Sequence, residues 1–226
     1  MKSILLFLLL VSIHCNAQYV SVFGGANYSK INYNANFMTA SVASSDFFDN
    51  PELNFTLGIG YEKRINDFYG VDFRFQYSNN SSSMTDKNLM EWFYVHNVSV
   101  KTVLFNPLIK LYPFRFDKFE PYLGFGPNMY YLLENPTYVG NGYNNDNFYE
   151  SVKKLNFGLT AAAGIGYKLN DNLMLKFELN YQKMLTHFMN TDYTFVQSVT
   201  PYLNAHKAQL DNYNTLIGIT YKFINH

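Results

Sequence analysis

The feature that most constrains this chain is a two-residue alternation of apolar and polar side chains. From Asn54 to Tyr77, Phe or other apolar residues at 55, 57, 59 and 61 alternate with polar residues or glycine, and the alternation resumes at 69, 71, 73, 75 and 77 after Asn66-Asp67. Alternation of this length indicates strands with one apolar and one polar face, and Asn-Asp is typical of a turn. The stretch predicts a β-hairpin.

The same pattern recurs in six further segments. These segments cover 19–29, 94–112, 121–133, 157–168, 173–182 and 213–223. With the hairpin they make eight strands, and the connections between them are alternately long and short. Outer-membrane barrels have an even number of antiparallel strands, short periplasmic turns and long outer loops. The sequence therefore predicts an all-β, eight-stranded antiparallel up-and-down transmembrane β-barrel with four long extracellular loops and both termini in the periplasm.

A soluble lipocalin-like barrel is the competing fold, because it also has eight up-and-down strands but an apolar interior. The size of the side chains on the two faces distinguishes the lipocalin-like barrel from the membrane barrel. The polar face carries glycine at 58, 60, 70, 124, 126, 158, 164 and 166, whereas the other face carries one large side chain after another. An eight-stranded barrel has room inside only for side chains. We therefore expect the apolar face to point outward, into lipid.

The segment 94–112 is less regular. Val98, Val100 and Leu104 share one parity, whereas Ile109 and Leu111 share the other. A slip of one residue indicates a β-bulge, and proline cannot donate to a central ladder. We predict a bulge at Asn106-Pro107.

Charged residues fall on the polar face of the predicted strands. They are Glu62, Arg64, Asp72, Arg74, Lys168, Lys176 and Glu178. Buried charges are costly unless they are paired, so we expect a packed lumen with ion pairs such as Arg74 with Asp72 and Lys176 with Glu178. A narrow ion-conducting path is the alternative, although a lumen of eight strands should be closed.

The N-terminus resembles a secretory signal. Lys2 precedes an apolar run at 4–11, and Cys15-Asn16-Ala17 approximates a small-residue cleavage site. This predicts a cleaved signal peptide at 1–17 and a barrel domain at 18–226. Lipidation of Cys15 is the alternative, but the bulky His14 precedes the cysteine where a small residue is wanted.

The sequence shows no pattern typical of a disulfide-rich protein, a nucleic-acid-binding protein, a metal site or a catalytic site. The single cysteine excludes a disulfide framework, and the formal net charge of zero gives no basic footprint for nucleic acid. The five histidines are scattered, and the oxygen-rich stretch 141–147 lacks the pattern of a calcium loop. His96 and Ser99 fall on opposite faces of one strand. We predict no enzymatic activity, no metal and no cofactor.

Several short motifs resemble the small outer-membrane β-barrel family of Bacteroidetes, the porin-like or PorT family. They are 24–29 (GGANYS), 106–108 (NPL), 110–112 (KLY), 121–127 (PYLGFGP) and 218–223 (GITYKF). The resemblance implies a location in the Gram-negative outer membrane and insertion by the barrel assembly machinery. The namesake of the family takes part in type IX protein secretion.

The predicted outer loops are rich in aromatic residues. They carry Phe37, Phe47, Phe48, Trp92, Phe93, Tyr138, Tyr143, Phe148, Tyr149, Phe188, Tyr193, Phe195 and Tyr202. Clustered exposed aromatics favour an interaction site, although those near strand ends can anchor the barrel in the headgroup layer. We expect a structural or surface-interaction role, with outer-membrane lipid and a protein or surface ligand as partners. A small porin-like transporter or an accessory of a type IX-like secretion system is the alternative.

Overall fold

The computed structural model describes residues 19–35, 50–83, 95–114, 116–140, 152–190 and 205–223. The signal-peptide and lipidation alternatives at Cys15 concern residues outside these ranges, as do most of the predicted outer loops. Eight long strands lie within them: β1 (Tyr19–Ala35), β2 (Asn50–Arg64), β3 (Tyr69–Ser83), β4 (Val95–Leu111), β5 (Phe119–Leu132), β7 (Leu155–Lys168), β8 (Leu173–Met184) and β10 (Ala205–Lys222). Two short strands, β6 (Thr137–Gly140) and β9 (Met189–Asn190), complete the set.

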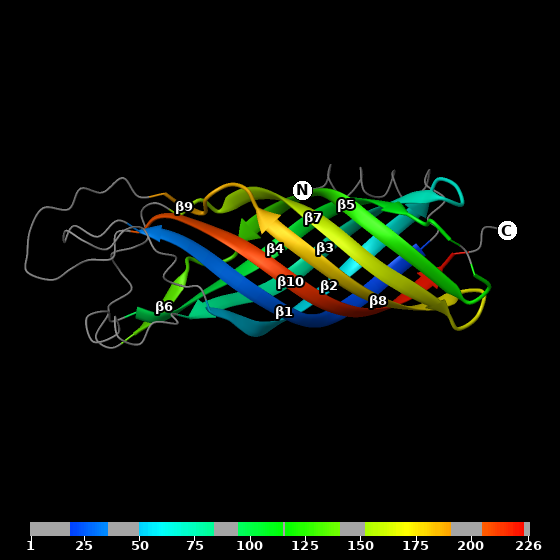
Figure 1. The fold of residues 1–226 in the computed structure, drawn as a ribbon, viewed down its shortest axis with the longest axis horizontal. Helices are drawn as coiled ribbons and strands as arrows, with labels where there is room; N and C mark the ends of the chain where they lie inside the picture. Colours follow the sequence, from blue (N-terminus) through cyan, green and yellow to red (C-terminus); the bar gives the residue numbers. More distant parts are fainter. Residues whose placement is uncertain are drawn as a thin grey trace, which may run out of the picture.

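Each long strand pairs antiparallel with the next, and β1 pairs with β10 to close the sheet (Figure 1). The closed eight-stranded barrel predicted from the alternation is confirmed. β6 adds to β4 and β9 adds to β10, which lengthens the wall at one end only. We call this the loop end, and the opposite end, where Tyr19 pairs with Lys222, the turn end. The described residues contain no helix long and apolar enough to cross a membrane.

Two turns at the turn end are fixed by asparagine. Asn66 Oδ1 accepts the backbone N–H groups of Phe68 and Tyr69 at 2.8 and 3.0 Å. Asn170 Oδ1 does the same for Asn172 and Leu173 at 2.9 and 2.8 Å. Asparagine favours turns because its side chain can replace a backbone acceptor in this way. The turn predicted at Asn66-Asp67 is therefore confirmed, and Asn170-Asp171 forms a turn of the same kind.

The outer surface is a continuous apolar band. Ile217 and Ile219 are 58% and 57% exposed, and the outward positions of the neighbouring strands are equally apolar. Tyrosines border the band at the loop end, at 28, 77, 131, 181 and 213, where Tyr213 pairs with Tyr28 and Tyr181 on the adjacent strands. Measured along the barrel axis, the span from Tyr213 to Tyr221 is roughly 20 Å, for a strand rise of about 3.3 Å per residue and a tilt of about 40°. The apolar face points outward, as predicted.

The predicted bulge in β4 is wrong. The register with β3 runs without a shift from Tyr69 opposite Leu111 to Ser83 opposite Asn97. Val98, Val100 and Leu104 instead point into the lumen, where they are buried. The change of parity arises because the loop-end half of the lumen accepts apolar side chains, not because the strand slips.

The prolines of β4 and β5 interrupt one point of the ladder. Phe105 pairs with Met129 and Ile109 with Phe125, and this constant register places Pro107 opposite Pro127. The N–H of Leu133 donates to the carbonyl oxygen of Lys101 at 3.0 Å, so these two residues form a hydrogen-bonded pair of β4 with the chain of β5. In an antiparallel sheet every second pair along the strands is of this kind, and the pair of Pro107 with Pro127 is one of them. Neither proline can donate. Two ladder bonds are therefore missing between β4 and β5 within the apolar band.

Candidate functional site

The predicted charged residues lie on the inside of the barrel. Glu62, Arg64, Asp72, Arg74, Lys176 and Glu178 are buried in the lumen. Lys168 lies at the turn-end rim with 39% of its side chain exposed, and it bonds Glu120 at 2.9 Å. The seven residues come from β2, β3, β7 and β8, so barrel closure brings together positions that are more than a hundred residues apart.

Four further residues belong to this cluster and were not singled out from the sequence. Lys110 is an inward residue of β4, and Tyr112, directly after that strand, is also buried. Glu120 and Tyr122 are inward residues of β5. Lys110 is completely buried. The alternation itself carried the signal, since Lys110 lies between the outward Ile109 and Leu111.

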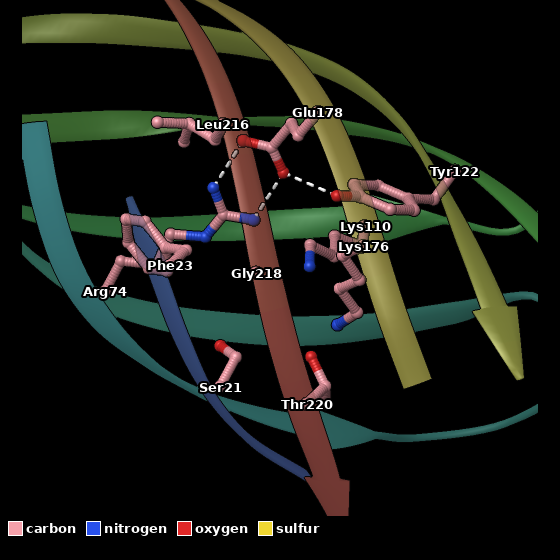
Figure 2. A pocket seen from close by; sticks show the side chains of 10 residues that line it. All are labelled: Ser21, Phe23, Arg74, Lys110, Tyr122, Lys176, Glu178, Leu216, Gly218 and Thr220. Carbon is pink, nitrogen blue, oxygen red and sulfur yellow. Dashed lines mark hydrogen bonds and ion pairs between the residues drawn. The ribbon is translucent and has the colours of Figure 1, made fainter. Parts of the chain in front are cut away.

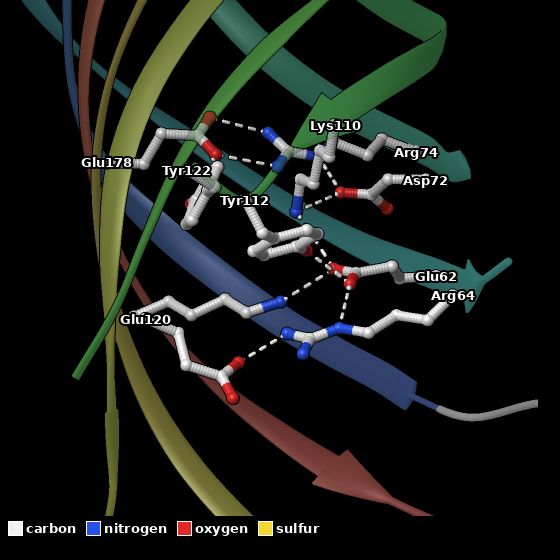
Figure 3. Close-up of polar contacts among 10 residues, drawn as sticks. Glu62, Arg64, Asp72, Arg74, Lys110, Tyr112, Glu120, Tyr122 and Glu178 are labelled. Carbon is white, nitrogen blue, oxygen red and sulfur yellow. Dashed lines mark hydrogen bonds and ion pairs between the residues drawn. The ribbon is translucent and has the colours of Figure 1, made fainter. Parts of the chain in front are cut away.

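Arg74 and Glu178 form the centre of the first group. Arg74 donates from Nη1 and Nη2 to the two oxygens of Glu178 at 2.5 and 2.6 Å, and from Nε to Asp72 Oδ2 at 2.8 Å (Figure 3). The hydroxyl of Tyr122 donates to Glu178 at 2.7 Å, and Lys110 Nζ lies 2.6 Å from Asp72. The predicted Arg74–Asp72 pair is present, and all three nitrogens of the guanidinium donate to carboxylates.

Glu62 is the centre of the second group. It accepts the hydroxyl of Tyr112 and the ammonium groups of Lys110 and Lys176, the last two at 3.1 and 3.0 Å. Arg64 Nε lies 3.3 Å from the same carboxylate, and its Nη2 bonds Glu120 (Figure 3). The predicted Lys176–Glu178 pair is wrong. The two side chains share a strand face, but Glu178 is taken by Arg74 across the lumen and Lys176 turns to Glu62.

Aromatic rings fill the space around these charges. The Arg64 guanidinium lies 4.1 Å from the ring centre of Tyr112 and 4.8 Å from that of Tyr19. Lys110 Nζ lies 4.4 Å from the ring centre of Tyr122. Such cation–π contacts add attraction and exclude water from the charged groups.

Uncharged amides lie on the loop-end side of the ion pairs. Gln182 donates to Gln76 at 3.1 Å across the barrel, and Asn214 donates to Asn180 at 2.7 Å. Beyond them the lumen holds apolar side chains, with Ile31, Leu132, Met184, Phe188 and Leu210 completely buried, together with buried polar ones such as Asn27, which donates to Asn80 at 2.8 Å. The described lumen is thus filled by ion pairs at the turn-end side and by a mixture of uncharged polar and apolar side chains toward the loop end.

The residues that the structure describes include no group of three or more His, Cys, Asp or Glu side chains placed to hold a metal ion. Ser99 lies on β4, while the side chain of His96 falls outside the described residues, as does the stretch 141–147. Among the described lumen residues the charges are engaged with one another. This arrangement joins the strands across the lumen.

Comparison with known proteins places this architecture in a family. The model of the outer membrane protein beta-barrel domain matches residues 3–223. The chain belongs to this family. It is an integral outer-membrane β-barrel protein, in agreement with its lipid-facing band. No curated protein matches the chain.

Several solved structures are similar to this chain, and OprG shares its fold. OprG from Pseudomonas aeruginosa is similar over 93% of this chain and 98% of its own, with 18% identity and a TM-score of 0.58. Neisserial surface protein A covers 90% of this chain and 97% of its own at 12% identity and a TM-score of 0.48. The outer membrane enzyme PagL covers 88% and 97% at 12% identity and a TM-score of 0.42. At these identities the likeness concerns the fold alone.

Proposed function

We propose that this protein is a non-conducting, non-catalytic outer-membrane barrel with a structural or surface-interaction role exerted from its loop end. The observation that carries the proposal is the bidentate pair of Arg74 and Glu178. β3 and β8 are four strands apart in either direction around the eight long strands, so the pair spans the full width of the lumen. A barrel held together across its middle is suited to presenting loops and poorly suited to passing solutes.

The proposed orientation has the turn end in the periplasm. Short turns are periplasmic and long connections extracellular in outer-membrane barrels. The pairing of Tyr19 with Lys222 brings both ends of the barrel domain to the turn end, which supports periplasmic termini. Cleavage of residues 1–17 fits this orientation, and mass spectrometry of the membrane-embedded protein should give a mature chain starting at Gln18.

The wall of the barrel continues past the apolar band at the loop end. β1 and β10 remain paired from Lys30 opposite Asp211 to Ala35 opposite Ala205, beyond the tyrosines at 28 and 213. Glu52 accepts from Ser81 at 2.7 Å and from Asn97 at 2.7 Å, which joins β2, β3 and β4 at the same end. We infer that this rigid polar collar presents the aromatic-rich loops to a protein or surface ligand. We propose that the protein is porin-like and related to the PorT group of Bacteroidetes, and that the collar is where it contacts other proteins.

Two measurements test the proposal together. In planar bilayers the purified protein should give no stable single-channel steps, and reproducible steps would favour the porin-like alternative. Extraction of a tagged chain in mild detergent should recover a defined surface partner that is lost when residues 141–147 are replaced by a Gly-Ser segment and retained when turn residue Asp67 is changed to Ser. Recovery of secretion components instead would favour the accessory role.

A further inference from the structure

The described lumen leaves little room for a ligand. A small cavity beside the ion pairs is lined in part by Ser21, Lys176 and Thr220, and its volume of about 20 Å³ holds about one water molecule (Figure 2). The outer surface offers a larger site, at the edge of the apolar band that faces the loop end.

Three tyrosines form a row across the strands that close the barrel. Tyr28 of β1 is paired with Tyr213 of β10, and Tyr213 is paired with Tyr181 of β8. The ring centres of Tyr181 and Tyr213 lie 4.8 Å apart. All three side chains are on the outward face at the edge of the apolar band, and tyrosines in this position lie at the level of the lipid headgroups.

A row of charged residues follows directly toward the loop end. Lys30, Asp211 and Lys183 lie two residues beyond the tyrosines on the same three strands, and they are paired across these strands in the same order. Two residues correspond to about 5 Å along the barrel axis, at a rise of about 3.3 Å per residue and a tilt of about 40°. These side chains therefore lie at the depth of the lipid headgroups, beyond the acyl chains.

The aspartate in this row does not pair with the lysines on either side of it. Oδ2 of Asp211 accepts the side-chain amide of Asn32 at 2.9 Å, and Asn32 lies two residues further toward the loop end than Lys30. Oδ1 of Asp211 is buried. Within the described part of the chain, Lys30 and Lys183 form no ion pair and no side-chain hydrogen bond. Their ammonium groups are available to a ligand on the outer surface.

The opposite wall of the barrel is arranged differently. Lys101 of β4 also lies toward the loop end, but it bonds Glu134 at 3.0 Å, and both of these side chains are about half exposed. β4 is four strands away from β10 in either direction around the barrel. Lysines without a described partner thus distinguish the wall formed by β8, β10 and β1 from the wall at β4.

We propose that the outward face of β8, β10 and β1 binds the phosphate group of an anionic lipid in the outer leaflet. The Cα atoms of Lys30 and Lys183 lie about 10 Å apart, because neighbouring strands are about 4.8 Å apart and two such spacings separate them. Their flexible stems allow both ammonium groups to donate to one phosphate, while the tyrosine rings pack against the lipid below it. The occupant is a lipid because this face continues the apolar band. Its place in the outer leaflet rests on the proposed orientation of the barrel.

Native mass spectrometry of the full chain in detergent tests this site, with phosphatidic acid and phosphatidylcholine as the two probes. The first phosphatidic acid molecule should bind more tightly than the first phosphatidylcholine molecule. Lys30→Gln and Lys183→Gln should each raise the dissociation constant for phosphatidic acid about fivefold, because each removes one cation at headgroup depth. Lys30→Arg and Lys183→Arg keep the charge and should keep the affinity.

Lys101→Gln is the matched control and should leave the dissociation constant unchanged, because Lys101 is already paired with Glu134. Heat-modifiable gel mobility verifies that each variant is folded. Equal affinity of the parent for the two lipids, an unchanged constant in both Lys→Gln variants at 30 and 183, or an equal effect of Lys101→Gln would overturn the proposal. Binding in detergent does not depend on orientation, so a failure here leaves the proposed surface role intact, and the recovery of a surface partner tests that role separately.

Discussion

Arg74 of β3 and Glu178 of β8 bond through both guanidinium Nη atoms at 2.5 and 2.6 Å, although 104 residues separate them in the chain. The pair forms only when the sheet closes, because the two strands lie opposite each other around the barrel. Closure and neutralisation are therefore coupled: before the barrel forms, the guanidinium has only its strand neighbour Asp72 within reach.

Glu178→Gln should destabilise the barrel strongly. It leaves the buried Arg74 with one carboxylate instead of two, and breaking one side of a buried pair costs about 3–5 kcal/mol. Urea unfolding in detergent, followed by gel mobility, measures the loss. Glu134→Gln is the matched control, since its pair with Lys101 at 3.0 Å has both side chains about half exposed and should leave the unfolding midpoint unchanged. Equal effects of the two variants would argue against a buried pair.

The double variant Arg74→Met/Glu178→Met should be less destabilised than Glu178→Gln alone. Two apolar side chains of similar length remove both charges at once, and such replacements are often near neutral. The same urea experiment gives the comparison. A double variant that unfolds more readily than the single variant would indicate that the hydrogen bonds of Tyr122 and Asn180 to Glu178 matter more than the pair itself.

Phe73→Arg should impair insertion. Phe73 is 41% exposed within the apolar band, and a cation near the bilayer midplane costs about 2–4 kcal/mol. Phe73→Leu, which keeps the position apolar, serves as the control. The fraction of heat-modifiable protein recovered from lipid vesicles reports folding, and efficient insertion of Phe73→Arg would show that this face does not meet lipid.

Gly164→Val should disturb the ion-pair network from a distance. A Cβ at this position would lie 2.4 Å from Cζ of Tyr122, the ring whose hydroxyl bonds Glu178. Overpacking of this kind costs about 1–3 kcal/mol. Ala163→Val, the next residue on the same strand but facing lipid, should be tolerated. A stable Gly164→Val barrel with an unshifted Tyr122 would refute the close packing described for the lumen.

Pro127→Leu should stabilise the seam between β4 and β5. The new N–H lies at a hydrogen-bonding position opposite the carbonyl of Pro107, and one ladder bond contributes about 0.5–1.5 kcal/mol. Met129→Leu, an apolar exchange at the next outward position, should leave stability nearly unchanged. Amide exchange at Phe105 and Ile109, the neighbouring hydrogen-bonded positions of this seam, should slow in Pro127→Leu, and unchanged exchange would mean that the seam is not opened by the prolines.

The alternation around Phe73 and Ile217 was sufficient to predict strands, their outward face and the count of eight, because a barrel wall imposes a local rule on every second residue. Asn66 likewise predicted a turn through chemistry that acts within three residues. The same local rule places Lys110 in the lumen, but it also gave the wrong bulge at Asn106-Pro107, because it cannot tell an apolar residue in the lumen from one that faces lipid. What a local pattern cannot determine is which inward residues meet across the barrel. Glu178 bonds Arg74 instead of its strand neighbour Lys176, because only the closed tertiary structure sets the distances between opposite strands.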